Sequence, residues 1–291
     1  MQKFEFKGLL CPVFTPFAQD KKSVNYDVID RYCQYLKSKN VQGVFVNGVT
    51  GEGTCLRIDE RKRLAEEWFK VCRKYSLTMT LCIGGCDIVD VYYLCEHAEK
   101  LGVDSIVLMP DLFYKPKIEE DLVEYFKNVC KYCPTRPVYY YHIPEYTYVK
   151  LNMVRFYELI QKSCPNFCGI FYRYGEIEVA YALWKNGCHL IMCNDTLLPG
   201  LKSLGFDAFC LISLNLWPEK VMETYGYTCQ WKLREAYEVH IKLCDCIKEI
   251  CNNHLKYCDW VEAFKSKFGK VVDFNVGGLR KPHCTWWYNK N

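Results

Sequence analysis

The sequence lacks any apolar run long enough to cross a membrane, because no segment approaches about 18 uninterrupted apolar residues. Its first ten residues, MQKFEFKGLL, also lack the apolar core of a signal peptide. Neither sign of charge is in clear excess: 38 Lys and Arg face 34 Asp and Glu, and the two signs are interspersed along the chain. These absences predict a cytoplasmic protein that has neither a membrane nor a nucleic acid as its partner.

Gly/Ser linkers, low-complexity tracts and short repeats are absent as well. What remains is a chain of 291 residues that is 50% hydrophobic and 25% charged, which is the composition of a folded globular protein. Disordered and fibrous proteins are thereby excluded. The length allows one large domain or two, since α/β barrels use about 200–250 residues as a single domain.

Short apolar segments alternate with amphipathic segments of helical spacing, such as 27–40, 59–75 and 119–133. Apolar strands separated by helices indicate a parallel sheet that is buried on both faces, and eight such units indicate a (β/α)8 TIM barrel. Two helical segments, 231–253 and 254–270, follow the last strand. We therefore predict a barrel at 1–226 and, in the same domain, a C-terminal helical extension at 227–291. The predicted strands are 8–14, 43–48, 78–85, 104–110, 138–143, 168–174, 189–194 and 208–213.

The carboxyl ends of barrel strands are where functional residues are expected. The second strand runs into a glycine-rich turn at 47–53, NGVTGEG, whose backbone N–H groups could hold an anionic oxygen. An ordinary strand-to-helix turn is an equally good interpretation. The fifth strand ends in YYYHIP at 139–144, where Tyr141 could act as an acid or base if it faces the barrel interior. Alternation then directs His142 to the opposite face.

Cysteine is frequent, with 20 residues in the chain, and metal binding must be weighed. Cys130 and Cys133 form a C-x-x-C pair without a second pair at finger-like spacing, and Cys251, His254 and Cys258 share one helical face. We predict no metal site and interpret the cysteines as small buried apolar residues of a reducing compartment. Nucleophilic hydrolysis has no support, because the sequence contains no G-x-S-x-G.

Six motifs occur in order along the chain: GLLCPVFTPF at 8–17, FVNG at 45–48, GVTGEG at 48–53, Glu60-Arg61, YHIP at 141–144 and GLRKP at 278–282. Together they resemble the N-acetylneuraminate lyase and dihydrodipicolinate synthase family of pyruvate-handling class I aldolases, and the N-acetylneuraminate lyase branch looks closest. The resemblance implies a homotetrameric (β/α)8 barrel in which a lysine on strand six forms a Schiff base with the carbonyl of a 2-oxo acid. No cofactor is expected.

The sequence departs from the family pattern at the positions that carry the chemistry. The lysine of the family follows a Gly-Ile or Gly-Leu pair, and the matching segment 167–174 places Phe171 at that position. Arg173, two residues further on, stays protonated and cannot form an imine. Val49 stands where the family has a proton-relaying hydroxyl, and Cys193 and Ile212 replace small residues of the substrate wall.

The resemblance therefore implies a degenerate site. Its catalytic positions are Tyr141, which is retained, and Phe171. Its substrate-binding positions are Val49, Thr50, Gly51, Cys193, Asp195, Thr196 and Ile212.

Two functions remain open, and we favour the first. In the first, the protein is an inactive family member that binds a small carboxylic acid or a sialic acid-like ligand at Thr50, Gly51 and Tyr141, or regulates an active paralogue as a subunit. In the second, it is an active lyase that cleaves sialic acid to N-acetylmannosamine and pyruvate through another lysine, with Lys115 the least implausible substitute. A reaction without an imine, using Tyr141, has less support.

Overall fold

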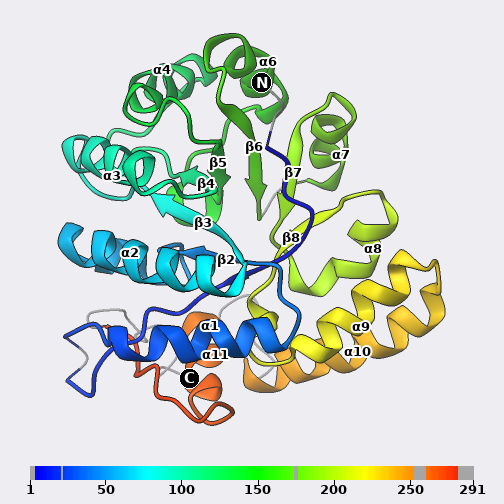
Figure 1. Ribbon diagram of the computed structural model, residues 1–291. Helices are drawn as coiled ribbons and strands as arrows, with labels where there is room; N and C mark the ends of the chain where they lie inside the picture. Colours follow the sequence, from blue (N-terminus) through cyan, green and yellow to red (C-terminus); the bar gives the residue numbers. More distant parts are fainter. Residues whose placement is uncertain (1–3, 21, 174–175, 252–259, 281–291) are drawn as a thin grey trace, which may run out of the picture.

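Eight parallel strands close into a barrel in the order β1 to β8 in the computed structural model, which describes residues 4–20, 22–173, 176–251 and 260–280. Helices surround the strands (Figure 1), so the predicted (β/α)8 fold is confirmed, as is a C-terminal helix beyond the barrel. All eight predicted strands are present, each within a few residues of its expected bounds. They are β1 Gly8–Pro12, β2 Gly43–Val46, β3 Thr78–Ile83, β4 Ser105–Leu108, β5 Val138–His142, β6 Phe167–Tyr172, β7 His189–Met192 and β8 Ala208–Cys210.

Local sequence signals mark the start of two of the helices. Asp87 caps α3, because its side chain accepts from the backbone N–H of Asp90, and Gly102 ends that helix with a φ of 79°. Asn152 caps α6 in the same way. The helices are α1 Ile29–Ser38, α2 Ile58–Tyr75, α3 Ile88–Leu101, α4 Glu119–Val129, α5 Pro144–Thr147, α6 Met153–Ser163, α7 Ile177–Lys185, α8 Leu198–Ser203, α9 Pro218–Cys229, α10 Leu233–Ile250 and α11 Trp260–Phe268.

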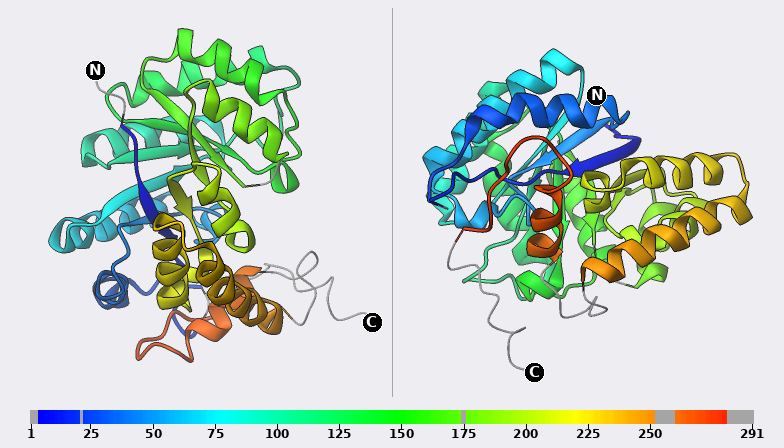
Figure 2. Two further views of the ribbon diagram at one scale, coloured as in Figure 1. Left: turned by 90° about the vertical axis from the view of Figure 1, so that its right-hand side faces the viewer. Right: turned by 90° about the horizontal axis from the view of Figure 1, so that it is seen from below.

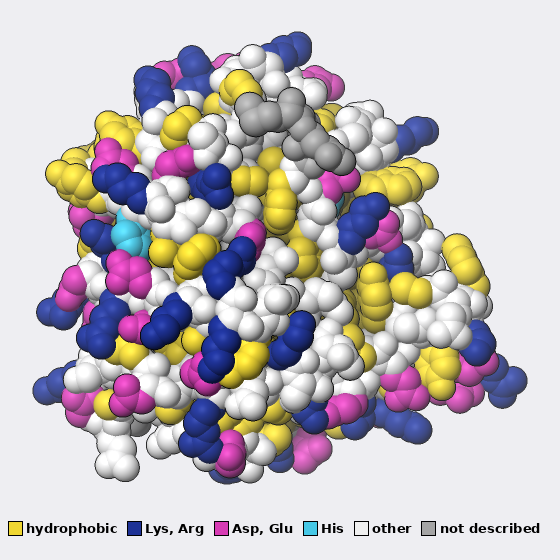
Figure 3. Space-filling view, in the orientation of Figure 1, with side chains coloured by type: hydrophobic (Ala, Val, Ile, Leu, Met, Phe, Trp, Pro, Cys, Tyr) yellow, Lys and Arg dark blue, Asp and Glu magenta, His cyan; other side chains and the backbone are white. Residues whose placement is uncertain are grey.

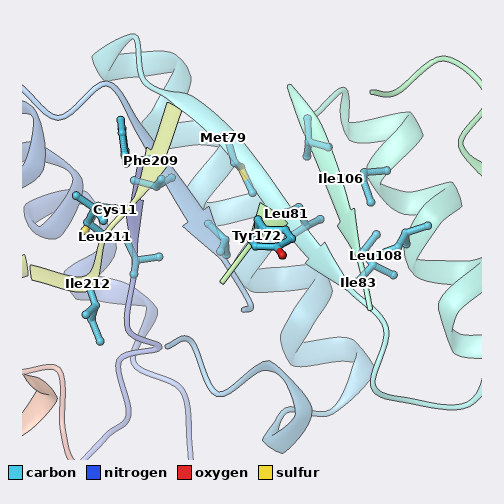
Figure 4. Packing of buried hydrophobic residues seen from close by; sticks show 14 of the residues in the cluster. Cys11, Met79, Leu81, Ile83, Ile106, Leu108, Tyr172, Phe209, Leu211 and Ile212 are labelled. Carbon is cyan, nitrogen blue, oxygen red and sulfur yellow. The ribbon is translucent and has the colours of Figure 1, made fainter. Parts of the chain in front are cut away.

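Two apolar clusters make up the core, because every strand is buried on both faces. The larger cluster lies between the barrel and the helices, and Figure 4 shows part of it, including Met79, Leu81 and Ile106. The smaller cluster fills the barrel. Strand alternation separates the two: Tyr139 and Tyr141 of β5 point inward, whereas Tyr140 points outward.

The C-terminal helices pack beside the end of the barrel. Helices α9 and α10 run side by side, and α11 lies near α1 (Figures 1 and 2). Helix α9 spans the boundary that we placed between residues 226 and 227, and the division into barrel and extension stays a prediction.

Charged side chains of both signs are spread over the visible face of the molecule (Figure 3). This distribution matches the interspersed charges of the sequence. Within the described ranges, no helix is both long and apolar enough for a membrane span.

Candidate functional site

The interior of the barrel brings together several of the predicted site positions. Tyr141 and Phe171 belong to the apolar cluster inside the barrel, and Val49 and Cys193 pack against it. We call this cluster the barrel interior. Its buried members are Phe6, Leu10, Phe45, Cys82, Val107, Met109, Tyr139, Tyr141, Ile143, Cys168, Phe171, Ile191, Ala208 and Cys210.

Phe171 lies at the centre of an aromatic group in the barrel interior. Its side chain is completely buried, and its ring centroid lies 5.0 Å from that of Phe45 and 5.6 Å from that of Tyr139. The ring of Tyr141 lies 6.1 Å from Phe171 and 5.5 Å from Phe45. Rings at these separations fill the space with apolar surface. The arrangement leaves an apolar centre where the resemblance implies an amine.

Tyr141 is the retained candidate acid or base, and its surroundings oppose ionisation. The side chain is 4% exposed, and burial raises the pKa of its phenol well above the ordinary value. The nearby Cys193 adds to this effect, whereas the guanidinium of Arg173 opposes it. Tyr141 is therefore a neutral hydroxyl at ordinary pH, able to donate a hydrogen bond.

Arg173 brings a positive charge close to the barrel mouth. It follows β6, and its guanidinium lies 5.5 Å from the centroid of the Tyr146 ring. Burial raises the pKa of Tyr141 and of the Asp195 carboxyl, and the charge of Arg173 opposes this rise in both groups. Arg173 cannot form an imine because its guanidinium stays protonated. Its electrostatic effect on Tyr141 is a feature of the fold that the sequence does not predict.

The glycine-rich turn at 47–53 is held by contacts to the rest of the fold. The hydroxyl of Thr15 donates to the carbonyl of Gly51 at 2.5 Å. A Cβ on Gly53 would lie 1.9 Å from the carbonyl oxygen of Asn47, so only glycine fits at this position. Thr50 is buried, at 6% exposure. These contacts show that the turn has a structural role. They are compatible both with an anion-binding turn and with an ordinary strand-to-helix turn.

Glu52 of this turn takes part in a charged network that we call the C-terminal junction, made of Glu52, Glu60, Lys265 and Arg280. Lys265 Nζ of α11 lies 2.8 Å from Glu52 Oε1, and both side chains are almost completely buried. The backbone N–H of Arg280 donates to Glu52, and its guanidinium donates to both oxygens of Glu60 at 2.6 and 2.7 Å. The junction joins the turn to the C-terminal part of the chain.

Three predicted ligand-binding positions, Asp195, Thr196 and Ile212, follow strands β7 and β8 and are not members of the barrel interior. Asp195 is buried, and its carboxylate accepts the backbone N–H of Ser213 at 2.8 Å. Thr196 donates to the side chain of Asn194, and its carbonyl accepts from His240. Ile212 belongs to the cluster between barrel and helices, as Figure 4 shows. These contacts stabilise the β7 and β8 ends, and whether the three residues also contact a ligand stays a prediction.

His142 occupies the face opposite to Tyr141, as the alternation predicts. Its ring stacks on Tyr172 at 5.2 Å, and burial lowers its pKa to about 4. It is a neutral packing residue outside the barrel.

The described lysines offer few candidates for an imine. Lys115, the substitute that we considered, is exposed on the β4–α4 loop, where its ammonium donates to the carbonyl of Leu112. Among the described residues, Lys265 is the only buried lysine, and it is ion-paired with Glu52. Burial lowers its pKa, and the charge of Glu52 opposes that effect.

Metal ligands do not gather in the described part of the chain: no three His, Cys, Asp or Glu side chains there could hold an ion together. His254 and Cys258, two members of the set considered from the sequence, lie outside the described residues. Most of the cysteines within the described ranges are buried, as predicted for packing residues.

The fold and the strand-end positions define a (β/α)8-barrel protein with its candidate site at the carboxyl ends of the strands. Residues 5–283 match the Dihydrodipicolinate synthetase family, and the chain belongs to this family. The resemblance inferred from the motifs is confirmed at this level.

Known relatives agree with this assignment. N-acetylneuraminate lyase of Mus musculus is 33% identical over 169 residues, which are 58% of this chain and 52% of that protein. The chain spans about half the length of the curated relatives it matches. The structure of Proteus mirabilis N-acetylneuraminate lyase superimposes with a TM-score of 0.87 at 26% identity and covers 96% of this chain and 92% of its own. That of the Aliivibrio salmonicida enzyme, a sialic acid aldolase, has a TM-score of 0.88 at 25% identity, with coverages of 97% and 92%.

Proposed function

We propose that this protein is a non-catalytic homologue of N-acetylneuraminate lyase whose barrel mouth binds a small carboxylic acid. The observation that carries the proposal is the completely buried ring of Phe171 among Phe45, Tyr139 and Tyr141. An imine requires a neutral amine that attacks the substrate carbonyl and then loses water. A phenyl ring can do neither.

The surroundings of Phe171 support the same conclusion. Val49 and Cys193 pack against the barrel interior, so apolar and thiol side chains occupy the positions from which a proton relay would act. The side chain of Val49 carries no hydroxyl that could exchange a proton with Tyr141, and burial keeps the phenol of Tyr141 neutral. A proton can therefore not be moved efficiently between Tyr141 and a substrate.

A carboxylate ligand is favoured by the groups that remain at the mouth. Arg173 places its charge near Tyr141, and a guanidinium can bind a carboxylate through two parallel hydrogen bonds. Thr50 and Gly51 in the turn after β2, together with the Tyr141 hydroxyl of β5, offer further donors. By resemblance to the family, the protein would act as a homotetramer or as a regulatory subunit of an active paralogue.

Borohydride trapping tests the proposal. The protein is incubated with pyruvate, reduced, and measured by intact mass and peptide mapping, with Proteus mirabilis N-acetylneuraminate lyase labelled in parallel. We expect no adduct on this protein and a stoichiometric adduct on the control. A stoichiometric adduct mapped to Lys115 or to any other lysine would overturn the proposal, because that lysine would then form the imine on which the family chemistry depends.

A second arm measures binding without chemistry. Pyruvate and N-acetylneuraminate are titrated while the thermal midpoint is followed, because a ligand that binds only the folded state raises it. The variant Arg173→Gln should need about tenfold more ligand, or a still higher concentration, to reach the same rise of the thermal midpoint, since it removes a charge-assisted contact. Arg234→Gln, on the exposed face of α10, is the matched control and should bind normally. No shift with either acid would contradict ligand binding.

A further inference from the structure

The segment that follows α11 returns to the start of the barrel. We call residues 269–280 the C-terminal strap, which is drawn in red in Figure 2. Its backbone joins the segment after β1, because the N–H of Phe17 donates to the carbonyl of Val276 at 3.0 Å. A Cβ on Gly277, whose φ is 68°, would lie 2.2 Å from the carbonyl oxygen of Phe17. The strap therefore runs in direct contact with the chain between β1 and α1.

Arg280, at the end of the strap, contacts three separate parts of the fold. Its guanidinium donates to the carbonyl of Cys55 at 3.0 Å and to the carbonyl of Lys22. The same group is paired with Glu60 of α2, and the Arg280 side chain is only 13% exposed. The backbone N–H of Arg280 donates to Glu52 Oε2 at 2.9 Å. One residue thus fixes the β1–α1 loop, the start of α2 and the glycine-rich turn relative to one another.

Glu52 holds the glycine-rich turn in a backbone conformation that needs support. Its φ of 51° and ψ of 35° lie in the left-handed region. A residue with a Cβ is strained there, and such strain persists only where surrounding contacts fix the backbone. The C-terminal junction supplies these contacts, because Glu52 Oε1 accepts from Lys265 at 2.8 Å and Oε2 accepts from the backbone of Arg280. Both carboxylate oxygens of the strained residue are therefore fixed.

Phe17 supports the same two cations. The ammonium nitrogen of Lys265 lies 4.4 Å from the centroid of the Phe17 ring, and the guanidinium carbon of Arg280 lies 4.7 Å from it. The Phe17 side chain is completely buried, and the attraction between a cation and an aromatic face is stronger away from water. Lys265 and Arg280 are thus held by an aromatic ring as well as by carboxylates.

Thr50 and Gly51 lie directly before Glu52 in the turn, and both are buried. The backbone N–H of Glu52 donates to the carbonyl of Val49 at 3.0 Å. The N–H groups of Thr50 and Gly51, in contrast, have no hydrogen-bond partner among the residues that the structure describes. Buried N–H groups without a partner are rare in folded proteins, so these two donors are available to a ligand.

We propose that the C-terminal strap is a positioning element for the barrel mouth. Acting through Glu52, Arg280 of the strap and Lys265 of α11 hold the turn in the conformation that presents its two available N–H groups to a carboxylate. This inference rests on the proposed function, because it explains how the same site is kept ready for its ligand. Donors that are already in place bind more tightly, since no ordering has to accompany binding.

A junction that only stabilises the fold would behave differently. Its loss would lower the stability of the whole protein and would leave the turn and the ligand affinity unchanged in the molecules that remain folded. A positioning role instead predicts a local effect. The turn should open more often, while a distant helix such as α3 keeps its protection from hydrogen exchange.

Amide hydrogen exchange tests the hold of the strap on the turn. Arg280→Gln removes the guanidinium contacts, and we expect the amides of Glu52 and Gly53 to exchange about tenfold faster or more, because the turn opens locally. Arg31→Gln is the matched control, since it removes an exposed ion pair with Asp273 of the same strap. This control should leave exchange in the turn unchanged. The amides of α3 serve as the internal reference for global unfolding.

Binding of pyruvate and of N-acetylneuraminate tests the link to the barrel mouth. Isothermal titration calorimetry is carried out at a temperature where circular dichroism shows each variant to be folded. Arg280→Gln should bind about tenfold more weakly or worse, whereas Arg31→Gln should bind normally. Arg280→Lys keeps a positive charge beside Glu60 and should lose less than Arg280→Gln in both measurements. If Arg280→Gln does not fold, Arg280→Lys carries the same comparison.

The outcomes separate this inference from the proposed function. Unchanged exchange in the turn of folded Arg280→Gln, or unchanged binding by that variant, would overturn the positioning role. Equally faster exchange throughout α3 would also overturn it, because the loss would then be global. If the unmodified protein binds neither acid, the proposed function fails, and the exchange measurement still decides whether the strap holds the turn.

Discussion

The barrel interior and the C-terminal junction lie on the two sides of one turn, 47–53, and have opposite character. Val49 packs against the barrel interior, which is apolar and carries four aromatic rings at its centre. Three residues later, Glu52 belongs to the junction, where Glu52 and Lys265 are paired out of solvent and Glu60 and Arg280 form a second, partly exposed pair. By the resemblance to the family, Val49 is expected to depart from the family pattern, whereas Glu52 and Gly53 belong to the glycine-rich motif that carries the resemblance.

Under the proposed function, the difference explains how a motif can outlast the chemistry that it accompanies. Glu52 holds Lys265 and the backbone of Arg280, and Gly53 fits only because it lacks a side chain. A change at either residue would disturb the fold of the chain. A change at position 171 need only preserve packing inside the barrel, which a phenyl ring does. Glu52 and Gly53 are therefore residues that the fold of this chain requires.

Reversion of the central residue tests this comparison most strongly. Phe171→Lys should lower the free energy of unfolding by roughly 5 kcal/mol at pH 7, because an amine among aromatic rings must be desolvated or neutralised. It should not restore useful lyase turnover, because Val49, Cys193 and Ile212 remain unchanged.

Urea unfolding and a pyruvate-release assay measure the two effects, and Phe171→Leu is the matched apolar control, expected to cost about 1 kcal/mol. Substantial turnover in the single Phe171→Lys variant would show that the rest of the site is intact.

The buried ion pair of the junction should give the next largest effect. Lys265→Met leaves the Glu52 carboxylate buried without its ammonium partner and should cost about 3–5 kcal/mol in the free energy of unfolding. The double variant Glu52→Gln with Lys265→Met removes both charges and should recover at least half of that loss. Denaturation of the single and double variants in urea gives both numbers. A cost below about 1 kcal/mol for Lys265→Met would place this pair with ordinary surface ion pairs.

Local patterns in the sequence were sufficient to predict the barrel. Apolar strands and amphipathic helices follow from side-chain periodicity, and alternation alone places Tyr141 inside and His142 outside. The motif at 47–53 predicts a site at the end of β2, but from the sequence its role cannot be separated from that of any other glycine-rich turn. The family itself was reached because its motifs occur in order over almost the whole chain.

Contacts between distant residues could not be predicted from the same patterns. Glu52 and Lys265 are separated by 213 positions, and nothing near either residue in the sequence indicates that the two form an ion pair. Asp195 matched a ligand-contacting position of the family, yet the structure also gives its carboxylate a backbone donor from Ser213. Each of these facts depends on the packing of whole helices and strands.

The smallest expected effect belongs to the outer ion pair of the junction. The hydrogen bonds from Arg280 and from the backbone N–H of Arg57 lower the pKa of Glu60 below its ordinary value of 4.5. A lowered folded-state pKa stabilises the protein above pH 4.5, and this contribution is lost as the pH falls through the folded-state value. Glu60→Gln should therefore be less stable than the unmodified protein by about 1 kcal/mol at pH 7, and the difference should shrink steadily below pH 4.5.

Urea midpoints between pH 3 and pH 7 measure this, with Glu235→Gln on the exposed face of α10 as the matched control. A stability difference independent of pH would mean that Glu60 acts through its shape and hydrogen bonds alone, and that the charge of the junction resides in the buried Glu52–Lys265 pair.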